Sequence, residues 1–191
     1  RELAPLDRED PDSDKDLLFK HMVHYVSKQR SLESATVLCY AIYVLKKIGT
    51  VSIDNLNFLI DNNPIVPEGR EDIFKHGIYF GLSGNLYVAM HILLPQTENL
   101  IRNLVKLCGD TTTFLHTDGT EDTKLLSKLF GSQKLKECYS EDIIFNLQSI
   151  MDNPLGENLR NLTAHGILSP EEGSSTKALS FLCLLIKLLS M

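Results

Sequence analysis

The longest helical pattern in this chain runs from Asn85 to Cys108 and limits the folds that the sequence can adopt. Apolar residues recur there every three or four positions, at Leu86, Ala89, Met90, Leu93, Leu94, Leu100, Ile101, Leu104 and Val105. This spacing places them on one face of an α-helix, which has to be buried against other helices. Pro95 lies inside the pattern, where its missing N–H predicts a kink or a division into two helices, and Gly109 ends the pattern.

Shorter helical patterns lie on both sides of this segment. They predict helices over residues 14–30, 31–48, 52–61, 71–82, 120–130 and 140–152, a helix around Arg160, and a final helix that starts near Ser174 or Ser175. A strand pattern occurs only around Thr111–His116, where threonines and turn residues up to Gly119 predict a small hairpin or an irregular loop. The sequence therefore predicts an all-α fold.

The length of 191 residues is typical of one domain with a substantial core. Residues 1–13 are charged, carry two prolines and lack an apolar pattern, which predicts a flexible acidic arm. Residues 14–66 form an N-terminal helical extension, and residues 67–191 form a helical bundle. Three roles stay open for the first 66 residues: they complete the bundle, mediate dimerisation or form a separate layer.

The composition is that of an ordinary soluble protein, with 43% apolar and 23% charged residues. The net charge of −6 excludes a general positive field for nucleic acid, so any contact with RNA has to be focal. The apolar segment 178–191 is shorter than the roughly 20 residues of a membrane span, which favours a buried helix. We therefore expect no membrane span within this sequence, although segments outside it could associate with a membrane.

The four cysteines, Cys39, Cys108, Cys138 and Cys183, lie far apart and contain no CxxC pair. This spacing indicates buried thiols in a reducing compartment such as the cytoplasm, and argues against a disulfide framework or a zinc site.

The segment from Glu157 to Gly166 combines the groups that cleavage of a phosphodiester needs. Arg160 supplies a fixed cation, Asn161 an amide and His165 a titratable imidazole. Asn161 and His165 are four residues apart and share one helix face, whereas Arg160 and His165 lie roughly 140° apart around an ideal helix. A long side chain or a second copy of the helix has to close that gap. By spacing alone, such a set is more often a hydrogen-bonded polar face than a catalytic site.

The string Arg160-Asn161-x-x-x-His165, followed by one more apolar helix, resembles the Arg-x4–6-His signature of the HEPN superfamily (higher eukaryotes and prokaryotes nucleotide-binding). Residues 91–102, which include Pro95-Gln96-Thr97-Glu98, extend the resemblance, as do Thr111-Thr112-Thr113 and Asp118-Gly119. Together they look like a HEPN subfamily that includes a protein linked to RNA degradation at the endoplasmic reticulum. The resemblance covers roughly residues 68–191.

This resemblance implies a four- or five-helix bundle and one of two functions. Many HEPN domains are endoribonucleases that need no metal or cofactor and act as homodimers. Carried over, His165 would be the general acid or base, Arg160 the phosphate-binding cation and Asn161 a supporting amide. Single-stranded RNA would then be cleaved through attack of the 2′-OH, leaving 2′,3′-cyclic phosphate ends. Other HEPN domains are catalytically silent and bind a partner protein or inhibitor, RNA or a nucleotide. The intact Arg, Asn and His favour the first function, and the acidic charge favours the second.

Glu98 and Arg102 are supporting candidates with two interpretations. Their spacing is that of a helix salt bridge worth about 0.2–0.5 kcal/mol if exposed. Alternatively, Glu98 faces the cleft and orients His165 or Arg160, since a partly buried carboxylate needs such a partner. Among the other histidines, His91 is expected to be a hydrogen-bonded core residue, while its position in the resemblance makes it a second candidate for the cleft. Four lysines are expected on the solvated surface, with an RNA path beside Arg102 as the alternative: Lys124, Lys128, Lys134 and Lys136.

Overall fold

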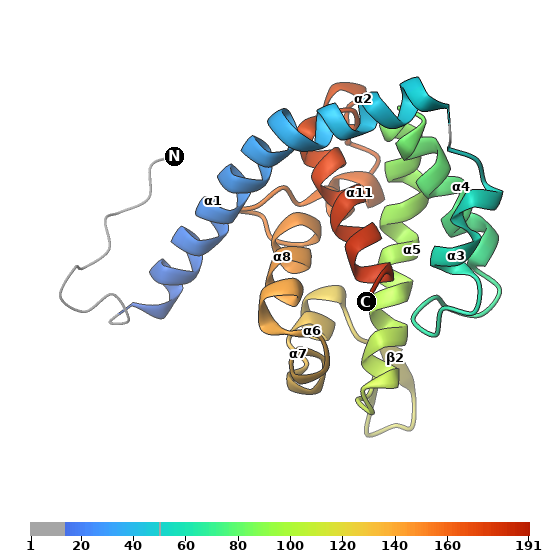
Figure 1. Cartoon of the computed structure of the whole chain (residues 1–191). Helices are drawn as coiled ribbons and strands as arrows, with labels where there is room; N and C mark the ends of the chain where they lie inside the picture. Colours follow the sequence, from blue (N-terminus) through green and yellow to red (C-terminus); the bar gives the residue numbers. More distant parts are fainter. Residues whose placement is uncertain (1–13, 50) are drawn as a thin grey trace.

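The computed structural model describes residues 14–49 and 51–191, so the predicted acidic arm at residues 1–13 lies outside the described residues. The all-α prediction is confirmed, because helices account for nearly all of the regular structure (Figure 1). The N-terminal elements are α1 (Lys15–Glu33), the π-helical η1 (Ser34–Leu38), α2 (Cys39–Ile48), the 3₁₀ turn η2 (Asp54–Leu56) and α3 (Asn57–Ile60). Then come α4 (Glu71–Leu82), α5 (Leu86–Leu107), β1 (Thr113–Leu115), β2 (Glu121–Thr123), α6 (Leu126–Phe130), α7 (Gln133–Tyr139), α8 (Glu141–Met151), α9 (Leu159–Ala164), α10 (Pro170–Gly173) and α11 (Thr176–Leu189).

The core lies between α4, α5, α8 and α11, with α5 and α11 near its centre (Figure 1). The apolar stripe of α5 is buried as predicted, and Phe74 of α4 and Phe181 of α11 are fully buried beside it. Gly77 and Gly81 allow α4 to approach closely. A Cβ atom at Gly77 would lie 2.5 Å from Leu93 Cδ2, and one at Gly81 would lie 2.6 Å from Leu182 Cδ2. These two glycines therefore serve helix packing inside a helix that the sequence predicted with the correct bounds.

Pro95 does not divide α5, which is continuous from Leu86 to Leu107. The ring of Pro95 faces solvent, while Leu93, Leu94 and Thr97 around it are buried. Packing of this buried face on both sides of the proline keeps one helix where the local signal predicted a possible division.

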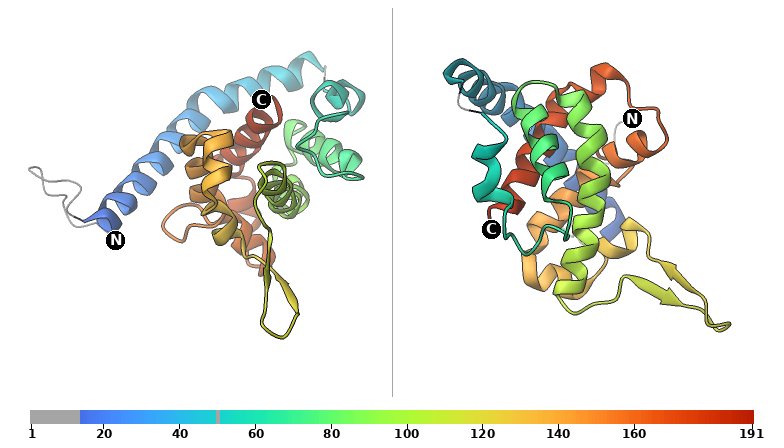
Figure 2. Two further views of the ribbon diagram at one scale, coloured as in Figure 1. Left: turned by 90° about the horizontal axis from the view of Figure 1, so that it is seen from below. Right: turned by 90° about the vertical axis from the view of Figure 1, so that its right-hand side faces the viewer.

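The predicted break between two N-terminal helices at Arg30 and Ser31 is wrong. The chain stays helical from Lys15 to Ile48 and passes through the π-helical segment η1 at Ser34–Leu38. The contacts of α1 with α8 and α11 outweigh the capping tendency of Ser31. Figures 1 and 2 show this long helix crossing the bundle, and the Phe19 and Phe145 rings meet edge to face there at 5.6 Å. The division of the chain at residue 66 stays a prediction.

The predicted small hairpin is confirmed, but the helix predicted from Thr120 starts only at Leu126. β1 and β2 pair antiparallel, with Thr113 opposite Thr123. The Asp118 carboxylate accepts hydrogen bonds from the Thr120 amide and hydroxyl, which forms the turn in place of a helix start. The hairpin extends away from the bundle (Figure 2).

The prediction of buried thiols is wrong for Cys39 and Cys138, which are exposed. Cys39 lies on α2, where no residue from Cys39 to Ile48 is buried. Cys138 lies on α7, which turns Leu135 toward the core instead. Cys108 and Cys183 are partly buried, and burial raises the pKa of the Cys108 thiol to about 12 and that of Cys183 to about 11. Within the described ranges, no helix is long and apolar enough to cross a membrane.

Candidate functional site

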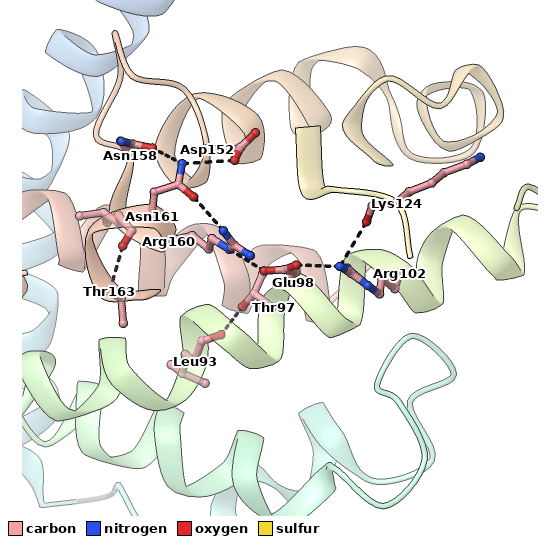
Figure 3. A network of polar contacts seen from close by, with 11 residues as sticks. Leu93, Thr97, Glu98, Arg102, Lys124, Asp152, Asn158, Arg160, Asn161 and Thr163 are labelled. Carbon is pink, nitrogen blue, oxygen red and sulfur yellow. Dashed lines mark hydrogen bonds and ion pairs between the residues drawn. The ribbon is translucent and has the colours of Figure 1, made fainter. Parts of the chain in front are cut away.

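Four of the five predicted site residues form one polar network between α5 and α9 (Figure 3). Glu98 and Arg102 lie one turn apart on α5, and Arg160 and Asn161 lie at the start of α9. Leu159 anchors α9, because its side chain is buried while those of Arg160 and Asn161 stay partly exposed. The packing of α9 on α5 thus brings residues from two distant parts of the chain to one place.

Glu98 is the centre of this network. One carboxylate oxygen accepts a hydrogen bond from Arg160 Nε at 2.5 Å, and the other accepts one from Arg102 Nη2 at 2.8 Å. The Glu98 side chain is only 15% exposed. Glu98 therefore pairs with Arg102 on its own helix and also with Arg160 of α9.

The Arg160 guanidinium is fixed from two sides. Nε donates to Glu98, and Nη1 donates to Asn161 Oδ1 at 2.8 Å. Nη2 has no hydrogen-bond partner within residues 14–49 and 51–191, and the side chain is 29% exposed. A guanidinium held in this way presents a remaining donor in a defined direction, which suits recognition of an anionic oxygen.

Asn161 is itself held by two residues that the sequence analysis did not single out. Its Nδ2 donates to Asn158 Oδ1 at 2.7 Å and to Asp152 Oδ1 at 3.4 Å (Figure 3). Asn158 precedes α9 in the left-handed conformation, with φ of 53°, which asparagine tolerates better than most residues. These contacts leave the side-chain oxygen Oδ1 of Asn161 directed at Arg160.

Asp152 carries a perturbed carboxyl group. Burial raises its pKa, while the hydrogen bond from Asn161 and the charge of Arg160 act in the opposite direction. Burial thus disfavours the charged form of Asp152, whereas Asn161 and Arg160 favour it.

His165 does not join the network within one chain. It occupies the C-terminal cap of α9, where its backbone N–H donates to the Asn161 carbonyl, and Gly166 follows with φ of 69°. The imidazole is exposed and forms no hydrogen bond to any other residue that the structure describes. The structure thus brings Arg160, Asn161, Glu98 and Arg102 together and leaves the His165 ring at the surface.

Arg102 connects the network to the hairpin. Its Nη2 also donates to the Lys124 carbonyl at 3.3 Å, and its buried Nη1 has no partner within the described ranges. The Lys124 side chain points away from Arg102 (Figure 3), and its Nζ donates to the carbonyl and hydroxyl of Thr111. Lys124 thus stabilises the base of the hairpin.

His91 is exposed, so its assignment to the core is wrong, although its Nδ1 does contact the Tyr87 carbonyl at 2.9 Å. It lies on the solvent side of α5, opposite the buried stripe. In the part of the chain that the structure describes, no three His, Cys, Asp or Glu side chains gather closely enough to hold a metal ion.

Asn158 and Asp152 could have been found from local signals. Asp152 ends the predicted helix 140–152 and Asn158 directly precedes the next one, and asparagine or aspartate is common at such boundaries.

Comparison of the chain with models of protein families, with curated proteins and with solved structures gave no match.

Proposed function

We propose that this chain is a metal-independent endoribonuclease of the HEPN type that cleaves single-stranded RNA as a homodimer. One observation carries the proposal. Arg160 is fixed by Glu98 and Asn161 with its Nη2 left unpartnered among the described residues, and an exposed His165 imidazole follows five residues later. This arrangement supplies an oriented cation and a free acid–base group near one another in sequence.

The chemistry requires three contributions from the protein. A base takes the proton of the ribose 2′-OH, and the 2′ oxygen then forms a bond to the adjacent phosphorus. An acid gives a proton to the 5′ oxygen as its bond to phosphorus breaks, and a cation stabilises the negative charge on the phosphoryl oxygens. An imidazole can serve as base or acid near neutral pH. The Arg160 guanidinium would stabilise the phosphoryl oxygens through its free Nη2.

A second copy of the chain would complete the site. Within one chain His165 makes no contact with Arg160 that would place both on one phosphate. A symmetric pair of chains, with the two α9 helices facing one another, would contribute two imidazoles and two guanidinium groups. One His165 would then act as base and the other as acid, while the two arginines bind the phosphate.

The experiment that tests the proposal is cleavage of a labelled single-stranded RNA in excess EDTA. Wild type should yield ends with 2′,3′-cyclic phosphate and 5′-OH, and DNA of the same sequence should stay intact because it lacks the 2′-OH. His165→Ala should lower the rate by about 10²–10⁴-fold, and Arg160→Ala should do the same. His76→Ala is a matched control, because His76 is another exposed histidine, and its ring contacts a carbonyl one turn back on α4. It should cleave like wild type.

A second function is favoured by a specific observation at the same site. Glu98 offsets part of the positive charge of Arg160 and Arg102, and the chain carries a net charge of −6. Both features suit a catalytically silent module that binds a partner protein, RNA or a nucleotide. Equal background cleavage by wild type and both variants, at concentrations where the dimer is present, would contradict the nuclease and favour this module.

A further inference from the structure

Arg30 on α1 makes a buried ion pair with Glu157, in the segment that joins α8 to α9. Arg30 Nη2 lies 2.6 Å from Glu157 Oε2, and the two side chains are 9% and 3% exposed. Arg30 also donates to Asn146 Oδ1 and Ser149 Oγ of α8, each at 2.9 Å. The N-terminal helix is therefore attached by one side chain both to α8 and to the segment that follows it.

A buried ion pair is weak evidence for stability, because removal of two charges from water offsets most of their attraction. Its distinctive property is directional, because a guanidinium that donates to Asn146, Ser149 and Glu157 tolerates few arrangements of these three acceptors. The Arg30 pair thus restricts where Glu157 can lie.

Glu157 is the neighbour of Asn158, and the contacts of Asn158 lead to Arg160. Asn158 accepts a hydrogen bond from Asn161, and Asn161 accepts one from Arg160. The segment is also held from the α8 side, because Gly156 packs so closely that a Cβ atom there would lie 2.0 Å from the Ser149 carbonyl oxygen. Ser149 is one of the residues that Arg30 holds.

We propose that Arg30 and Glu157 are positioning residues for Arg160. Their ion pair holds the segment between α8 and α9 in the arrangement that lets Asn158 and Asn161 orient the Arg160 guanidinium. The N-terminal helix α1 is then part of the functional unit, and displacement of α1 would release the site. The consequence for RNA cleavage rests on the proposed function, whereas the consequence for the position of Arg160 does not depend on it.

The test uses two readouts on the whole chain. The first is the NMR signal of the Arg160 Nε–H, identified by its absence in Arg160→Lys, which reports the hydrogen bond to Glu98. Arg30→Met and Glu157→Gln should shift or broaden this signal. Lys75→Met is the matched control, because it breaks an ion pair of 2.6 Å to Asp61 near α4, and it should leave the signal in place. The second readout is the rate of RNA cleavage, which misplacement of Arg160 should lower about a hundredfold.

The double variant Arg30→Met/Glu157→Met separates positioning from stability. Buried ion pairs often tolerate replacement by apolar residues of similar volume, so this variant should fold. It should nevertheless show the displaced Arg160 signal, and its rate should be no lower than those of the single variants, because the two residues act as one unit. An unchanged Arg160 signal in this folded variant would overturn the inference. If wild type does not cleave RNA, the nuclease proposal fails, and the NMR signal alone decides whether Arg30 positions Arg160.

Discussion

Glu98 of α5 and Arg160 of α9 lie 62 positions apart in sequence, and their side chains meet at 2.5 Å. The same carboxylate holds Arg102 at 2.8 Å. The segment around Pro95 and the segment at Arg160 are thus joined through one acidic residue. A carboxylate that is 15% exposed and shared by two guanidinium groups fixes both of them.

Glu98→Gln should weaken the fold and release Arg160. The amide keeps the shape of the side chain but offers one acceptor oxygen in place of two, so one of the hydrogen bonds to Arg160 and Arg102 becomes weaker and the other is lost. We expect a loss of about 1–3 kcal/mol in the free energy of unfolding, measured by urea denaturation. RNA cleavage should fall as well, since the guanidinium loses its fixed orientation.

Glu137→Gln is the comparison for this change. Glu137 accepts a hydrogen bond from Gln133 one turn away on α7, but it is exposed. Its substitution should alter the free energy of unfolding by less than about 0.5 kcal/mol. Equal effects of the two substitutions would show that solvent compensates the charge of Glu98.

The helices that the sequence predicted well are those whose apolar stripe is also their buried face. The bounds of α4 were predicted correctly, and α8 and α11 within one or two residues. Two short helices were missed although their start signals are readable. Ser132 caps α7 by accepting from the Leu135 amide, and Ser169 with Glu172 forms a capping box at α10.

The failures have a common physical cause, which is packing that overrides a local signal. Ser31 is a good helix cap, yet the helix continues because Arg30 and Ser34 are anchored to distant residues, Glu157 and Ser180. For the site, Arg160 and Asn161 were readable as a motif. Their orientation was not, because it depends on Glu98 and Asn158, which meet them only after α9 packs on α5.

The stability of Asp152→Asn relative to wild type should increase as the pH rises from acidic to neutral. Burial raises the pKa of the Asp152 carboxyl in the folded state. The folded state therefore binds this proton more tightly than the unfolded state does. The contribution of Asp152 to stability falls as the pH rises from the ordinary aspartate pKa of about 3.9 through the raised value. Asparagine removes this fall and still accepts a hydrogen bond from Asn161.

Urea denaturation of both proteins, from below the ordinary aspartate pKa of about 3.9 up to neutral pH, measures this difference. Asp110→Asn is a comparison of opposite sign. The Ser132 hydroxyl lowers the pKa of Asp110, so that carboxylate stabilises the fold at neutral pH and loses its contribution as the pH falls through the lowered pKa. The same pH trend for the two variants would contradict the assignment of Asp152.

Gly156→Ala should disrupt the segment that carries Glu157 and Asn158. The added Cβ would lie 2.0 Å from the Ser149 carbonyl oxygen, a backbone atom that can move only together with α8. We expect a loss of about 1–3 kcal/mol in the free energy of unfolding and a loss of RNA cleavage. The Cβ atom of Gly81→Ala would meet side-chain atoms and no backbone atom, with the end of the Leu182 side chain nearest at 2.6 Å. It should cost less stability and spare cleavage, and the reverse order would contradict the role of the close contact at Gly156.

Pro95→Ala should stabilise the protein. Pro95 is exposed in the interior of α5, where it removes one backbone hydrogen bond of an otherwise continuous helix. Alanine restores the N–H that can donate to the carbonyl of His91, four residues back. We expect a gain of about 1–3 kcal/mol in the free energy of unfolding, the range set by the helix propensities of the two residues.

Pro154→Ala is the matched control, because Pro154 is also exposed but lies in the turn after α8. There the proline restricts the unfolded chain, so its replacement should cost about 0.4–1 kcal/mol. Thermal unfolding of both variants and wild type measures these effects: the Tm of Pro95→Ala should rise and that of Pro154→Ala should fall. A loss of stability in Pro95→Ala would mean that the proline ring makes packing contacts worth more than the missing hydrogen bond. The position of Glu98, one turn further along α5, would then depend on Pro95 as well.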